Sequence, residues 1–253
     1  MIGDVGRLVE IESPSLDIAA LSQSARELAS IMEQRLGSPA TIVDCVAGPH
    51  VHWMGGGTPK VLIVGHHDTV FPKGALAARP FTVEGDKATG PGIFDMKAGI
   101  VQAIHGVAAL ADKSGVEILI TSDEEVGSVH SRDLIIERAK VCGAVLVLEP
   151  SADGGALKTA RKGTGTFELH VLGRASHAGL EPEKGVNALV EASAQILRIN
   201  TFGNAELGTT VTPTVAVVGT ADNVVPALAK ISIDVRVVEA VERERVDALM
   251  NSL

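Results

Sequence analysis

A chain of 253 residues, of which 45% are hydrophobic and 21% charged, is long enough for one large or two small globular domains. Only 2% of the residues are aromatic and none is Tyr, so a core has to be built from Ala, Val, Leu and Ile. The formal net charge of -9 argues against a nucleic-acid partner, which would favour a basic surface.

The first 16 residues and the cysteines are typical of a soluble protein of a reducing compartment. Residues 1–16 carry several charges and lack the apolar stretch of a secretory signal. No stretch approaches the roughly 20 apolar residues that span a membrane. Cys45 and Cys142 lie in no CxxC motif, so we expect reduced thiols. We therefore expect a cytoplasmic protein that does not bind membranes.

The first part of the chain alternates between strand and helix patterns. Leu21, Leu28 and Ile31 have helical spacing within a predicted helix, and Gly37 is a plausible stop. The predicted helices cover residues 18–36, 97–111 and 131–140, and the predicted strands cover residues 41–46, 61–64, 116–120 and 144–148. This order predicts an α/β fold with a mainly parallel sheet and helices on both faces.

The pattern changes after about Gly154. An alternating strand at residues 166–172 is followed by a helix at 185–198, strands at 209–218 and 229–237, and a helix that begins near 238. The order β-α-β-β-α predicts an α+β ferredoxin-like unit that lacks its last strand. The sequence therefore predicts a catalytic domain at 1–155 and a lid or dimerisation domain at 156–253.

Polar residues follow the apolar strands of the first part. His66 and Asp68 follow the strand at 61–64, Glu124 and Glu125 follow the next, and Glu149 follows the third. Ligands of open parallel sheets bind beyond the carboxyl ends of the strands, so we expect these side chains at one edge. The glycine-rich turn before the helix at 97–111 adds one more acid, Asp95, to the same region.

Imidazole and carboxylate groups are the usual ligands of a hydrolytic metal site. Asp95 is placed to bridge two ions, and Asp68 is placed to hold the ring of His66. Adjacent Glu124 and Glu125 point in different directions, so one can bind metal while the other accepts a proton. Taken singly, each feature also fits a surface loop, a solvated turn, a strand end or, for Asp95, a helix N-cap.

Five segments together resemble a known family. GHHDTV, GPGIFDMKAG, TSDEEVGS, LEPS and GRASHAGLEPEKGVNALVEA are similar, in order and spacing, to the two-zinc amidohydrolases and peptidases. That family includes glutamate carboxypeptidase, acetylornithine deacetylase, succinyl-diaminopimelate desuccinylase and aminoacylase. The resemblance is strongest to the bacterial glutamate carboxypeptidase branch, and it extends from Leu8–Ser15 to Arg236.

The resemblance implies a role for each residue of the sheet edge. The implied metal ligands are His66 and Glu149 for the first ion, Asp95 as the bridge, and Glu125 for the second ion; Glu124 is the implied general base and Asp68 the residue that orients His66. The implied cofactor is zinc, two ions per complete site, with cobalt or manganese as alternatives. The peptide bond after Asp95 becomes a candidate for a cis bond. His67 is interpreted as a spectator.

The second domain resembles the family's dimerisation lid, which predicts a homodimer. His177 resembles the histidine that reaches across the dimer to stabilise the oxyanion. Asn223 and Arg236 resemble substrate-binding residues, with Arg236 as a clamp for a free carboxylate. Without the resemblance, the favoured interpretation of His177 is a turn residue, and that of Arg236 is a salt bridge at a strand end.

The pattern departs from the family in one respect. A histidine near the C-terminus of family members binds the second metal, and none of the eight histidines here takes that place. We therefore expect this chain to hold the first metal better than the second and to be weakly active or inactive alone.

The predicted function is metal-dependent hydrolysis of an amide or peptide bond next to a free carboxylate, with C-terminal glutamate as a candidate product. The substrate would be a small peptide or an N-acyl amino acid. Two alternatives remain open. One is an N-acyl amino acid deacylase or desuccinylase of the same family. The other is a non-catalytic dimerising binding protein.

Overall fold

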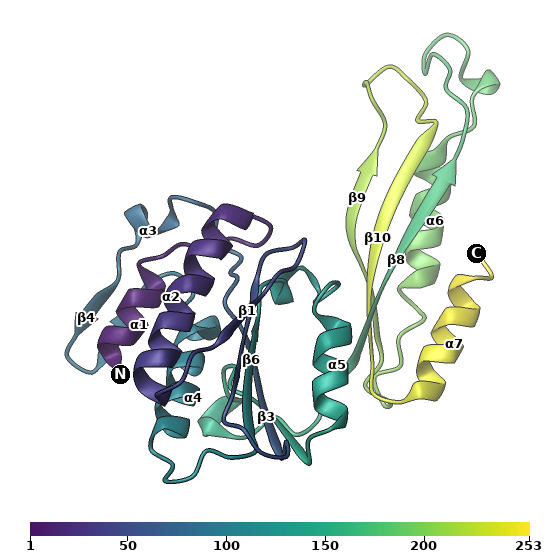
Figure 1. The fold of residues 1–253 in the computed structure, drawn as a ribbon. Helices are drawn as coiled ribbons and strands as arrows, with labels where there is room; N and C mark the ends of the chain where they lie inside the picture. The colour runs from purple at the N-terminus through teal and green to yellow at the C-terminus, as the bar shows by residue number, and fades with distance from the viewer. The chain divides into compact units, whose positions relative to one another are not determined.

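The computed structural model describes all 253 residues, and they form two compact units, Met1–Leu157 and Lys158–Leu253. Each unit has its own hydrophobic core. Figure 1 shows helices and a sheet in each unit. None of the helices combines the length and apolar character needed to cross a membrane.

The first unit is built on a five-stranded sheet of order β1-β2-β6-β3-β7. Its strands are β1 (Thr41–Val43), β2 (His50–Met54), β3 (Val61–His66), β6 (Val116–Thr121) and β7 (Ala144–Val147). The three apolar runs form β3, β6 and β7, and β3 pairs in parallel with both of the others. Strands β1 and β2 extend the sheet in antiparallel fashion. The predicted α/β class is confirmed, with an antiparallel extension at one side.

Helices cover this sheet. They are α1 (Ile2–Val9), α2 (Ile18–Leu36), α4 (Ala98–Ala108) and α5 (Arg132–Lys140); the four-residue helix α3 (Ala75–Ala78) has no buried residue and is not among them. Asp17 caps α2 by accepting a hydrogen bond from the backbone of Ala20 at 3.0 Å, and Gly37 ends the helix in the left-handed conformation. In Figure 1, α1, α2 and α4 lie on one side of the sheet and α5 lies on the other.

Several short elements were not predicted. They are α1, α3, β2 and the hairpin of β4 (Thr82–Glu84) and β5 (Lys87–Thr89). Strand β2 contains His50 and His52, whose polarity interrupts the apolar run by which a buried strand is recognised. Tertiary pairing with β6 therefore decides its conformation.

Strand β7 forms one edge of the sheet. Val145, Leu146 and Val147 are 43%, 50% and 55% exposed, although all are apolar. By contrast, the central strand β6 buries every residue from Glu117 to Thr121. The apolar composition of β7 is that of an interior strand, whereas its position is that of an edge.

The second unit is a three-stranded antiparallel sheet of order β8-β10-β9. Its elements are β8 (Gly163–Leu172), α6 (Ala188–Ile199), β9 (Thr210–Val218), β10 (Leu228–Val237) and α7 (Ala240–Met250). Alternate residues of β10, including Ile231 and Ile233, are buried in a core shared with α6 and α7. The β-α-β-β-α order agrees with the ferredoxin-like pattern of the sequence.

A buried carboxylate joins three helices of the first unit. Asp4 in α1 is 3% exposed, and it accepts hydrogen bonds from Arg35 in α2 at 2.9 and 3.1 Å. Its Oδ2 atom also lies 2.7 Å from Nε2 of His105 in α4. The hydrogen bonds from Arg35, opposed by burial and assisted by His105, hold the pKa of Asp4 well below its usual value.

We expect Asp4→Asn to destabilise the chain at pH 7 by about 2 kcal/mol, because Arg35 and His105 would lose a charged acceptor. The folded pKa of Asp4 lies below the unfolded value of about 3.9, so the ionised carboxylate stabilises above that pH and the benefit is lost as the pH falls. Urea unfolding at pH 7 and at pH 3.5 measures both effects. The exposed Asp86→Asn is the control. Equal stability of Asp4→Asn and wild type at pH 7 would contradict the expectation.

Candidate metal centre

The end of β3 places His66 and Asp68 at the carboxyl edge of the sheet. Both side chains are at most 1% exposed. Nδ1 of His66 donates to the backbone carbonyl of Asp68 at 3.0 Å, and it lies 3.4 Å from Oδ1 of the Asp68 carboxylate. Asp68 therefore fixes the imidazole mainly through its backbone, and Nε2 is the ring nitrogen left to meet other groups.

The turn before α4 brings Asp95 to that nitrogen. Oδ1 of Asp95 lies 3.0 Å from Nε2 of His66. The Asp95–Met96 peptide bond is cis, which confirms the sequence prediction. Met96 is buried beside Gly65, where an added Cβ would lie 2.9 Å from the Met96 methyl carbon. The absence of a side chain at Gly65 thus lets the turn pack directly against β3.

The end of β6 carries Glu124 and Glu125. Their backbone N–H groups donate to the Asp68 carboxylate at 3.2 and 3.1 Å. Asp123, which is fully buried, accepts from the backbone N–H groups of His130 and Ser131 and so ties the loop to the start of α5. Asp68 therefore orders the loop of the two glutamates as well as His66.

The end of β7 carries Glu149. It follows Leu148, whose carbonyl oxygen would lie 1.9 Å from a Cβ built on Gly99 in α4. No side chain fits at Gly99 unless the backbone shifts. The close approach of α4 to this strand end is what places Glu149 beside the other acidic residues.

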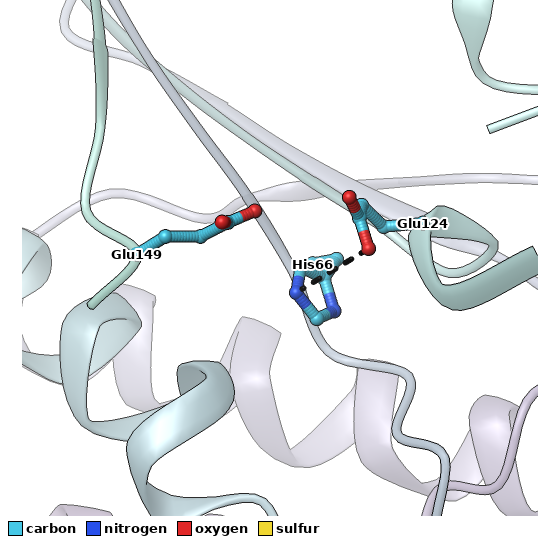
Figure 2. A group of neighbouring side chains, drawn as sticks. All are labelled: His66, Glu124 and Glu149. Atoms are coloured by element: carbon cyan, nitrogen blue, oxygen red, sulfur yellow. Dashed lines mark ion pairs between the residues drawn. The ribbon is translucent and has the colours of Figure 1, made fainter. Parts of the chain in front are cut away.

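The three strand ends and the turn before α4 bring five residues of the predicted site together. The ligand atoms of His66, Glu124 and Glu149 all lie within 4.8 Å of one another, and so do those of His66, Asp95 and Glu125. Figure 2 shows the carboxylates of Glu124 and Glu149 converging on the ring of His66 from two different segments. His66 belongs to both groups, so it is the common point of the cluster.

The cluster concentrates negative charge. Burial raises the pKa of Glu124; His66 opposes this rise, while the charges of Glu149, Asp68 and Asp95 add to it. Burial and neighbouring acids raise the pKa of Glu125 as well, again against His66. Such crowding is unfavourable unless a cation balances it, and imidazole with several carboxylates is a donor set that divalent zinc, cobalt or manganese accepts.

The imidazole of His66 responds to the same charges. Burial would lower its pKa, but the hydrogen bond and charge of Asp68, together with Glu124, raise the pKa of His66 to about 9. His67 behaves in the opposite way, because burial lowers its pKa to about 4. Its ring nitrogens contact Ser24 Oγ at 3.1 Å and the carbonyl of Pro49 at 3.0 Å, so His67 points away from the cluster into the protein.

The second unit holds the other three predicted residues. His177 and Asn223 lie close together, because backbone hydrogen bonds join Ala178 to Asn223 and Val225 to Ser176. Nδ1 of His177 accepts from the N–H groups of Gly179 and Leu180 at 3.1 Å each, which leaves Nε2 to carry the proton of the neutral ring.

Arg236 is not part of that pair. It lies near the far end of β10, on the order of 25 Å along the strand from Leu228. Its guanidinium group contacts both carboxylate oxygens of Asp234 at 2.9 to 3.2 Å. The structure therefore shows Arg236 in the alternative arrangement, a salt bridge near a strand end, and its role as a carboxylate clamp stays a prediction.

Two residues that contact the cluster's loops were missing from the predicted site. Ser15 donates to Asp68 Oδ2 at 2.8 Å, and Lys97 is buried two residues after Asp95. Both lie inside segments that carried the resemblance, LVEIESPS and GPGIFDMKAG. A serine or lysine has no distinctive spacing, so the sequence offered no reason to separate them from ordinary loop residues.

Residues 159–253 match the M20 peptidase dimerisation domain. The chain is 41% identical over 205 residues to carboxypeptidase G2 of Pseudomonas sp. (strain RS-16), covering 79% of the chain and 49% of the relative. It is 30% identical over 198 residues to a succinyl-diaminopimelate desuccinylase of Rhizorhabdus wittichii, covering 72% and 52%. The chain thus spans about half the length of these curated relatives.

Solved structures show the same fold. An aminopeptidase PepT from Bacillus cereus superposes with a TM-score of 0.77 at 22% identity, covering 99% of this chain and 69% of that one. An M20 metallo-carboxypeptidase from Sulfolobus solfataricus gives 0.76 at 16% identity, covering 99% and 75%. The fold is that of the M20 metallopeptidases. Residues 159–253 form an M20 peptidase dimerisation domain, and over the part that is matched the chain is similar in sequence to curated M20-type hydrolases.

The close approach of Gly99 to Leu148 predicts that replacement by Ala changes stability in opposite directions at two glycines of α4. Gly99→Ala places a methyl group against the Leu148 carbonyl and is expected to lower stability by at least about 2 kcal/mol. Gly106, also in α4, has no atom within 4 Å of an added Cβ, so Gly106→Ala is expected to stabilise by about 0.5 to 1 kcal/mol. Thermal unfolding measures both. Equal shifts in the same direction would contradict the close approach.

Proposed function

We propose that this chain carries the metal site of a zinc-dependent hydrolase that cleaves an amide or peptide bond next to a free carboxylate. The observation that supports it best is the convergence of His66 with four carboxylates from three strand ends and one turn. The similarity to carboxypeptidase G2 favours a carboxypeptidase-like reaction, with C-terminal glutamate as a candidate product.

Each ligand has a proposed place. His66 and Glu149 would hold the first ion, Glu125 the second, and Asp95 both. When bound, divalent ions at such a site acidify a water molecule and polarise the scissile carbonyl. The hydrogen bond from His66 Nδ1 to Asp68 keeps Nε2 directed toward the ligand cluster.

Glu124 is proposed as the general base and acid. Its carboxylate lies 3.9 Å from Nε2 of His66, and its raised pKa moves it toward the range in which a carboxyl group exchanges protons near neutral pH. Asp68 holds its backbone N–H, so the position of the base depends on the residue that also orients His66. Glu124 would take a proton from the attacking water and return it to the leaving nitrogen.

The second unit is proposed to supply substrate contacts and a dimer. The arrangement of His177, with Nε2 as the protonated nitrogen, suits a donor that stabilises an oxyanion in the partner subunit. Asn223 would bind the substrate, and Arg236 would exchange Asp234 for the substrate carboxylate. The match to a dimerisation domain supports a homodimer.

A deacylase is the second candidate function, because desuccinylases are also relatives of the chain. The proposed chemistry at His66 and Glu124 would be the same, and only the acyl group of the substrate would differ. The metal ligands therefore do not discriminate between the two candidates.

Metal binding tests the site directly. Because His66 belongs to both ligand groups, we expect His66→Ala to weaken Zn²⁺ binding by about 100-fold or more, beyond the effect of losing an outer contact. Zn²⁺ titration followed by calorimetry measures the affinity, and exposed His130→Ala is the matched control. Unchanged Zn²⁺ affinity in His66→Ala would remove the basis of the proposal.

Activity tests the role of Glu124. We expect Glu124→Gln to lower the rate of amide hydrolysis by about 100- to 10,000-fold while Zn²⁺ affinity stays near that of wild type. The substrates are N-acetyl and N-succinyl amino acids, dipeptides and folate-like glutamyl amides, and exposed Glu137→Gln is the control. A loss of Zn²⁺ affinity equal to that of Glu149→Ala would instead make Glu124 a ligand.

A further inference from the structure

The segment Leu8–Ser15 begins with the last two residues of α1, continues toward α2 and contains none of the proposed ligands. It nevertheless contacts the loop that follows His66 and the turn that carries Asp95. The backbone N–H of Ser15 donates to the carbonyl of Thr69 at 3.2 Å, and that of Thr69 donates to the carbonyl of Ser13 at 2.9 Å. The segment thus runs beside the loop that follows His66.

Two serine hydroxyl groups strengthen this first contact. Ser13 is buried, and its Oγ donates to the carbonyl of His67 at 2.6 Å. Ser15 Oγ donates to Oδ2 of Asp68 at 2.8 Å. Ser15 therefore touches the residue that orients His66 and holds the backbone of Glu124 and Glu125.

Lys97 makes the second contact. Its side chain is 2% exposed, and Nζ donates to the carbonyls of Leu8 at 3.0 Å and Ile11 at 2.9 Å. A buried ammonium group is costly unless its donors are satisfied. Here the segment accepts two hydrogen bonds from the ammonium group, so the turn that carries Asp95 is tied to Leu8–Ser15.

Glu12 holds the same segment from outside. Its carboxylate accepts from the backbone N–H groups of Gly74 and Leu76, each at 2.9 Å. These hydrogen bonds lower the pKa of Glu12. The segment is therefore anchored on both sides and does not depend on Ser15 or Lys97 alone for its place.

We infer that Ser15 and Lys97 are positioning residues, which act through Leu8–Ser15 to set the separation of His66 and Asp95. The inference rests on the proposed function, because it assigns the segment to the metal site. A purely structural role for Lys97, satisfying the carbonyl groups at the end of α1, would affect stability without affecting the site.

The test measures the site in three variants of the whole chain. Lys97→Met removes both hydrogen bonds from Nζ to the segment. Ser15→Ala removes the side-chain hydroxyl group, whereas Ser15→Thr retains a hydroxyl group. Lys73→Met is the control, because Lys73 is an exposed lysine that contacts Asp17 at 3.6 Å. The readouts are Zn²⁺ affinity, the visible absorption spectrum with Co²⁺ as the bound probe, and thermal unfolding.

We expect Lys97→Met and Ser15→Ala each to weaken Zn²⁺ binding about 10-fold or more and to change the Co²⁺ spectrum. Ser15→Thr and Lys73→Met should match wild type. Ser15→Ala decides the matter if Lys97→Met fails to fold, since Ser15 is only half-buried.

Wild-type affinity and spectrum in folded Ser15→Ala and Lys97→Met would reject this inference and leave the metal site intact. An absence of Zn²⁺ binding to wild type would reject the proposed function and the inference together. A loss of stability with an unchanged Co²⁺ spectrum would assign Lys97 and Ser15 a structural role, which also rejects the inference.

Discussion

The candidate site depends on one carboxylate, that of Asp68. It is fully buried, accepts hydrogen bonds from Ser15 and from the backbone of Glu124 and Glu125, and lies 3.4 Å from Nδ1 of His66. A buried negative charge is retained only when such donors compensate its desolvation. The hydrogen bonds outweigh burial and lower the pKa of Asp68, so the group that organises the site remains charged.

Around Asp68, the fold holds several negatively charged side chains close together despite their mutual repulsion. Several acidic side chains converge on His66, although each would be more stable in water or farther from its neighbours. Backbone contacts hold them there: the close approach of α4 to Leu148, the packing of Met96 against Gly65, and the fixed loop after β6. Close packing at Gly99 and Gly65, together with the backbone hydrogen bonds to Asp68, therefore holds the acidic side chains near one another.

Much of the fold and of the cluster could be predicted from the sequence. The apolar runs of β3, β6 and β7 have a clear pattern. The rule that ligands bind beyond strand ends predicts from the sequence that His66, Glu124 and Glu149 lie close together. Strand β2 could not be predicted, because its histidines conceal a strand that is decided by pairing with β6. The contacts of Lys97 could not be predicted either. Its partners are backbone carbonyl groups, which every residue has, so no residue type in the sequence indicates them.

Strand β7 has a consequence for the behaviour of the chain in solution. Its three exposed apolar side chains stand on a strand edge with unpaired backbone groups, and such an edge is a template for adding a further strand. The strand that precedes Glu149 in the candidate site is therefore also the strand whose open edge can pair with another chain. We therefore expect association of the chain through this edge to increase with protein concentration.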